Sequence, residues 1–105
     1  MQPLGVRIAG LGKYLPERIV TNDELEKKLN LSPGWIAKRT GVLERRYAKH
    51  ETSVSQAVEA AKQALENAGF SVHDIDAVIG ASSVPQQAIP CTAALVQREL
   101  GMPDG

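Results

Sequence analysis

The stretch Ile75-Asp76-Ala77-Val78-Ile79-Gly80-Ala81 decides the fold class. It is a nearly continuous apolar run, which is typical of a strand buried on both faces of its sheet. Such strands occur in parallel sheets that carry helices on each side. Helical patterns stand before and after this run, and the predicted order is strand, helices, strand, helix, strand, helix. The sequence therefore predicts an α/β fold.

The helix before this run has a clear period. Its apolar positions recur every three or four residues, at Val54, Ala57, Val58, Ala61, Leu65 and Ala68. A capping box at 53–56 predicts its start, and Gly69 predicts its end. After a polar loop at 82–88, a second helix is predicted over 92–100, because Pro90 precedes it and Gly101 follows it.

The first half of the chain predicts shorter elements. A strand is expected over 6–11, and a second one, with one face wetter than the other, over 43–48. Between them, a capping box at 21–24 starts a helix that reaches about Leu29. Ser32-Pro33 starts another, which Gly41 ends. Three strands are fewer than an average sheet contains, so residues 1–105 are expected to be part of one larger domain.

Composition excludes several classes of function. Of the 105 residues 43% are hydrophobic, and the formal net charge is zero, so neither a nucleic acid nor a membrane is an expected partner. No apolar run is long enough to span a bilayer, and no secretory signal is visible. A single cysteine fits a reducing compartment, so we expect the protein in the cytoplasm.

Few residues predict catalysis. Cys91 stands near a helix start, where the dipole can lower a thiol pKa, but no base lies near it in sequence. The favoured interpretation is a small, partly buried core residue. His50 and His73 fall in charged or polar connections and do not have zinc-ligand spacing. Gly10-Leu-Gly12 lacks the third glycine of a dinucleotide fingerprint. No catalytic, metal-binding or cofactor-binding residue follows from these patterns.

Trp35 and Arg39 are one helical turn apart and share a face. A tryptophan can stack on a nucleotide base, and an arginine can clamp a phosphate. The alternative is structural: a tryptophan that anchors a short helix and an arginine that pairs with a local glutamate. Arg45 and Arg46, taken alone, predict a solvated strand face.

A resemblance to a known family joins these pieces. The order and spacing of motifs from Gly10 to Pro16, from Thr21 to Glu26, from Trp35 to Arg46 and from Pro90 to Gln97 resemble the β-ketoacyl-acyl-carrier-protein synthase III family of the thiolase-like superfamily. The resemblance implies a layered α/β/α/β/α fold of two similar halves, with this chain as part of the N-terminal half.

The resemblance also implies an activity. These acyltransferases condense an acyl-CoA primer with malonyl-acyl-carrier-protein in fatty-acid or related acyl-chain biosynthesis, as homodimers, with acyl-CoA as substrate and no separate cofactor. The acyl group is carried on a cysteine, and a histidine and an asparagine assist. All three catalytic residues are expected beyond Gly105, so residues 1–105 alone are expected to be inactive.

The family's motifs assign roles to four residues. Trp35 matches a tryptophan that stacks on the CoA adenine, and Arg39 and Thr40 lie in the tract near the nucleotide phosphates. Ile89 matches a bulky position that helps close the acyl pocket of the partner in the dimer. Cys91 matches a small position, not the nucleophile.

Three alternatives to this function remain open at this point. One is another condensing enzyme that uses acyl-CoA, and a second is a non-catalytic acyl-CoA-binding or partner subunit of a condensing enzyme. The third is a redox protein that works through Cys91.

Overall fold

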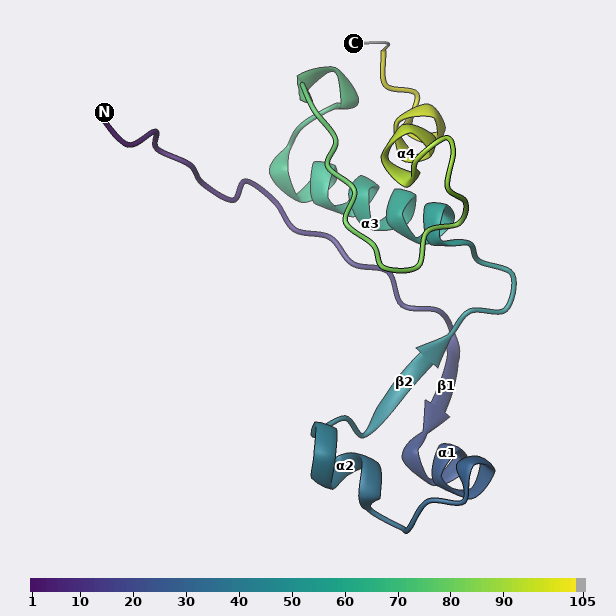
Figure 1. Ribbon diagram of the computed structural model, residues 1–105. Helices are drawn as coiled ribbons and strands as arrows, with labels where there is room; N and C mark the ends of the chain where they lie inside the picture. Colours follow the sequence, from purple (N-terminus) through teal and green to yellow (C-terminus); the bar gives the residue numbers. More distant parts are fainter. Residues whose placement is uncertain (104–105) are drawn as a thin grey trace. The chain divides into compact units, whose positions relative to one another are not determined.

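The computed structural model describes residues 1–103, which form two units (Figure 1). The first, here called the hairpin unit, spans residues 15–51. The second, here called the helical unit, joins residues 1–14 to the described residues from 52 onward. The nucleotide-site candidates Trp35, Arg39 and Thr40 belong to the hairpin unit, and Ile89 and Cys91 belong to the helical unit.

The hairpin unit contains the chain's paired strands. β1 (Arg18–Thr21) and β2 (Glu44–Tyr47) are antiparallel, with Val20 opposite Arg45. The side chain of Val20 is only 1% exposed. β1 was not expected from the sequence, although Ile19, Val20 and Thr21 are β-branched residues of the kind enriched in strands.

Two short helices lie between these strands. α1 (Asn22–Leu29) begins at Thr21, whose hydroxyl accepts from the Glu24 amide at 3.3 Å, so the predicted cap is confirmed. The second half of the predicted capping box is not found, because the Glu24 carboxylate pairs with Arg18 instead. On the exposed side of α1, the hydrogen bond and charge of Asp23 raise the pKa of Lys27.

α2 (Trp35–Thr40) differs from the prediction at its start. Its N-cap is Gly34 in the left-handed conformation, and no side chain next to it in sequence caps the helix. The expected cap at Ser32 is therefore wrong, because the acceptor comes from a different helix. Gly41, with a φ of 70°, ends α2 as predicted.

The helical unit is built on two helices that lie side by side (Figure 1). α3 (Ser53–Ala68) and α4 (Thr92–Leu100) end at Gly69 and Gly101, as predicted. Their buried core consists of four aliphatic side chains, Val54, Val58, Leu95 and Val96. The short 3₁₀ helix η1 (Val72–Asp74) follows α3 and is capped by Ser71.

Two predicted strands do not form within residues 1–103. Residues 6–11 and 75–81 have no regular secondary structure, and the one sheet in the described part of the chain is the β1–β2 pair. A strand needs a hydrogen-bonded neighbour, and neither segment has one here. The predicted burial of the second segment is also wrong, because Ile79 is 93% exposed.

The segment before β1 packs on α3. The carboxamide of Asn67 donates to the Leu11 carbonyl at 2.8 Å, and the Lys13 amide donates to the Gln63 side chain at 2.7 Å. A Cβ at Gly12 would stand 1.9 Å from the Ala60 carbonyl oxygen. The glycine is therefore required for close packing on a helix, which explains Gly12 without a dinucleotide.

Candidate functional site

Trp35 and Arg39 meet on the surface of α2. The guanidinium carbon of Arg39 lies 4.8 Å from the centre of the Trp35 ring, which is cation–π geometry. Trp35 is 40% exposed, and Arg39 is exposed as well. The predicted shared face is thus confirmed, and it presents an aromatic surface and a cation to solvent. Such a pair can accept a planar base and a phosphate.

Ile36 explains why the Trp35 face points outward. This neighbouring residue is buried at 8% exposure and anchors α2 to the rest of the hairpin unit. Side chains at successive helical positions diverge, so burial of Ile36 leaves the Trp35 face exposed.

Thr40 ends the same helix. Its hydroxyl donates to the Ile36 carbonyl at 2.7 Å and accepts from the Val42 amide at 3.1 Å. A hydroxyl has two acceptor positions, so one remains for a ligand. The first role of Thr40 is to close the last turn of α2 beside Arg39.

Glu26 supports this site through the backbone at the start of α2, although no role was predicted for it from the sequence. It is 5% exposed, and its two carboxylate oxygens accept from the backbone amides of Gly34 and Ile36, each at 3.1 Å. Glu26 stands within a charged run of α1, beside Lys27 and Lys28, so periodicity alone predicts a solvated side chain.

Arg45 and Arg46 are not a solvated strand face. Both are half-buried, and their guanidinium groups donate to carbonyls of the chain, Arg45 to Val20 at 3.2 Å and Arg46 to Pro16 at 3.0 Å. Arg45 also donates to the Asn22 carboxamide at 2.5 Å. These arginines fix the hairpin and the start of α1, so they are engaged in structure.

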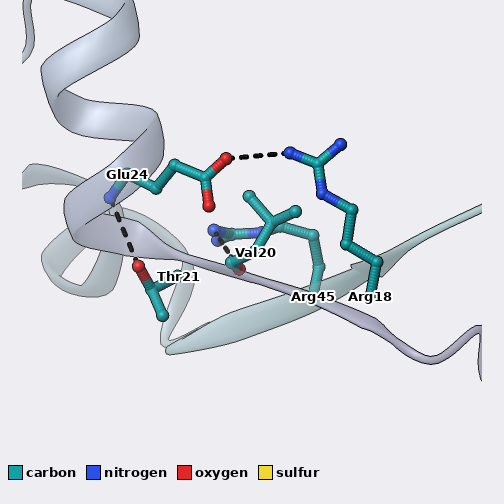
Figure 2. A network of polar contacts seen from close by, with 5 residues as sticks. All are labelled: Arg18, Val20, Thr21, Glu24 and Arg45. Carbon is teal, nitrogen blue, oxygen red and sulfur yellow. Dashed lines mark hydrogen bonds and ion pairs between the residues drawn. The ribbon is translucent and has the colours of Figure 1, made fainter.

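Figure 2 shows how this network ties β1 to α1. Glu24 lies between the Thr21 hydroxyl, which accepts from its amide, and the Arg18 guanidinium, which pairs with its carboxylate at 3.0 Å. Arg45 reaches across from β2 to the Val20 carbonyl. Arg18 therefore pairs with a nearby glutamate, while Arg39 stacks on Trp35.

Ile89 and Cys91 stand just before α4. Ile89 is 88% exposed, and its carbonyl accepts from the Gln87 carboxamide at 2.9 Å. Cys91 is the N-cap of α4, but its side chain does not cap the helix, and the thiol is exposed. The expectation that Cys91 is a partly buried core residue is therefore wrong. It borders a hollow of about 250 Å³ lined mostly by small residues of the loop at 80–88 and the start of α4.

Within residues 1–103, no group of three or more histidine, cysteine, aspartate or glutamate side chains is placed to hold a metal ion. Asp74 accepts from the Ser71 amide at 2.8 Å, within the capping box of η1. In the same part of the chain, no helix is both long and apolar enough to cross a membrane.

Known proteins similar to this chain are condensing enzymes. No protein-family model matches it. β-Ketoacyl-[acyl-carrier-protein] synthase III of Acidiphilium cryptum is 48% identical over 99 residues, which is 93% of this chain and 31% of that protein. The crystal structure of 3-oxoacyl-[acyl-carrier-protein] synthase III from Aquifex aeolicus superposes with a TM-score of 0.88 at 46% identity. That match covers 93% of this chain and 32% of the other.

A more distant structure agrees in fold. Xanthomonas campestris OleA, here in its E117D form, superposes with a TM-score of 0.77 at 24% identity over 90% of this chain. These neighbours confirm the thiolase-like α/β fold class, of which the chain covers one part. The chain spans about a third of the length of the relatives it matches.

Proposed function

The chain is homologous to a segment of β-ketoacyl-acyl-carrier-protein synthase III, and on this premise we propose that it is part of an acyltransferase that condenses acyl-CoA with malonyl-acyl-carrier-protein. The observation that supports this most directly is the exposed Trp35–Arg39 pair on α2. The names of the relatives favour a synthase over a non-catalytic partner subunit.

In this proposal α2 binds the nucleotide end of acyl-CoA. The adenine stacks on the indole of Trp35, a contact worth about 1–3 kcal/mol per base in other proteins. Arg39 turns its guanidinium toward a phosphate, which replaces a cation–π contact of about 0.5–1 kcal/mol at an exposed position. Thr40 offers its remaining acceptor position beside them.

The rest of the proposal concerns the whole protein. Residues 1–105 form the N-terminal portion of the thiolase-like domain, and the nucleophilic cysteine, the histidine and the asparagine lie outside this stretch. Ile89, exposed in this chain, helps close the acyl pocket of a second copy in a homodimer. Acyl-CoA is a substrate, no further cofactor takes part, and the protein works in the cytoplasm.

A coenzyme A titration tests the nucleotide site. Trp35 is the sole tryptophan, so its fluorescence reports directly on the proposed stacking surface. We expect coenzyme A to quench Trp35. We also expect Arg39→Gln to weaken binding by about tenfold, equivalent to about 1.4 kcal/mol, because the variant loses the phosphate contact.

Lys38→Gln is the matched control. Lys38 neighbours Arg39 on the same helix and is exposed, but it does not contact the indole in the cation–π pair. Its removal changes net charge equally and should alter the affinity less than twofold. Equal losses in the two variants, or no quenching in the wild-type chain, would contradict the proposed site.

A further inference from the structure

Glu26 is the only polar or charged residue buried within residues 1–103. Burial of a carboxylate is costly unless hydrogen bonds compensate it. Here both oxygens are used: Oε2 accepts from the Gly34 amide and Oε1 from the Ile36 amide, each at 3.1 Å. The cost of burial is thus offset at the start of α2.

These two amides are the ones directly before and after Trp35. The amide of Trp35 itself donates to the Ser32 carbonyl at 3.0 Å. The three successive amides that open α2 are therefore all bonded, and Glu26 holds the outer two. The backbone on both sides of Trp35 is therefore hydrogen-bonded to Glu26 of α1, an arrangement called the clamp below.

α2 needs this external support. It has only six residues, and helices this short are not stable by themselves in water. Its N-cap, Gly34, has a φ of 82° and no side chain, so no oxygen of the N-cap side chain caps the helix. A carboxylate at a helix N-terminus also interacts favourably with the helix dipole. Glu26 supplies from α1 what the local sequence of α2 lacks.

The site on α2 depends on this arrangement. Trp35 is the first residue of α2, and Arg39 follows one turn later with its guanidinium over the indole. If the first turn frays, the indole loses its fixed direction and Arg39 loses its stacking partner. Neither contact of Glu26 reaches the exposed face where a nucleotide would bind.

We propose that Glu26 is a positioning residue that holds the Trp35–Arg39 surface in the orientation that receives the adenine nucleotide of acyl-CoA. The inference rests on the proposed function for its ligand. The clamp on Trp35 does not depend on the ligand, because it follows from the two hydrogen bonds that the amides of Gly34 and Ile36 donate to Glu26.

The test replaces Glu26 with glutamine in the 105-residue chain. A glutamine carboxamide has one acceptor oxygen, and its NH₂ group would face a second donor, so only one of the two amides can remain bonded. We expect Glu26→Gln to weaken coenzyme A binding by about tenfold and to speed the decay of Trp35 fluorescence anisotropy. Glu24→Gln is the control, since Glu24 lies on the same helix but is about half exposed and pairs with Arg18. It should leave both readouts within twofold of the wild type.

A second variant guards against loss of folding. Glu26→Asp keeps the charge, but its side chain is one methylene shorter and cannot reach both amides. We expect the same changes at smaller amplitude. Wild-type affinity and wild-type anisotropy in a folded Glu26→Gln or Glu26→Asp chain, judged by far-ultraviolet circular dichroism, would overturn the proposal.

The two readouts separate this inference from the proposed function. If coenzyme A fails to quench Trp35 in the wild-type chain, the nucleotide site is wrong, and with it the ligand assigned here. The anisotropy decay still tests whether Glu26 restrains Trp35, because this measurement needs no ligand. Looser motion of Trp35 in Glu26→Gln alone would support the clamp, and unchanged motion would refute it.

Discussion

Gly12 is held against α3 at a distance that leaves no room for a side chain. A Cβ there would stand 1.9 Å from the Ala60 carbonyl oxygen and 2.6 Å from the Ala64 amide nitrogen. Both are backbone atoms of a helix, so neither can turn away as a flexible side chain would. The close approach also brings the neighbouring Leu11 carbonyl and Lys13 amide within hydrogen-bond range of α3 side chains.

We expect Gly12→Ala to destabilise the helical unit by about 1–3 kcal/mol, the usual cost of overpacking. Gly5→Ala is the matched control, because a Cβ added at Gly5 would have no neighbouring atom within 4 Å. Urea denaturation followed by the helical circular dichroism signal measures both. A Gly12→Ala chain as stable as Gly5→Ala would show that the N-terminal segment does not pack on α3.

At the element scale, the observed start of α3 differs by one residue from the start predicted from the sequence. The pattern at 53–56 predicted the start of α3, but the cap is Thr52, one residue earlier. The Thr52 hydroxyl accepts from the Ser55 amide at 3.0 Å, and the Ser55 hydroxyl accepts from the Thr52 amide at 2.9 Å. Several hydroxyl residues stand in a row here, so the motif fits in more than one register.

Thr52→Ala should therefore cost about 1 kcal/mol of helix stability, because it removes one half of the capping box. Ser53→Ala is the control in the adjacent register. The Ser53 hydroxyl makes only a long contact of 3.5 Å to the Val84 carbonyl, so its loss should cost less than half as much. Thermal unfolding of α3 in the two variants compares them. A larger loss in Ser53→Ala would restore the register expected from the sequence.

At the scale of the whole molecule, the proposed binding surface and the one cysteine of the chain belong to different units. The Cys91 thiol is exposed and does not cap α4, and Cys91 is the only cysteine in the chain. A thiol becomes a good nucleophile when a base or a positive site holds it as thiolate. Because the family resemblance matches Cys91 to a small position and not to the nucleophile, we expect residues 1–105 to bind acyl-CoA but not to take up its acyl group.

We expect the intact mass of the chain to stay at 11.3 kDa after incubation with acetyl-CoA, even under conditions in which coenzyme A is expected to quench Trp35. The longer homologous synthase of Aquifex aeolicus serves as the positive control for acetylation. A stable gain of one acetyl group that disappears in Cys91→Ser would contradict the expectation and would make Cys91 a reactive thiol.

The sequence by itself determined the local elements whose causes are local. Helix ends at Gly41, Gly69 and Gly101 follow from the ease with which glycine adopts a positive φ, and all three are found. The period of α3 and the i, i+4 spacing of Trp35 and Arg39 likewise predicted a core face and a shared surface, because both depend only on helix geometry. Similarity over 93% of the chain then confirmed the family resemblance.

Tertiary structure decided what depends on partners distant in sequence. Glu26 is buried because the amides at the start of α2 need an acceptor, and Arg45 and Arg46 are engaged because carbonyls of Val20 and Pro16 lie within reach. The apolar run at 75–81 has the composition of a buried strand but no hydrogen-bonded neighbour among residues 1–103. Composition records a preference for burial, whereas pairing and burial require another part of the chain at the right place.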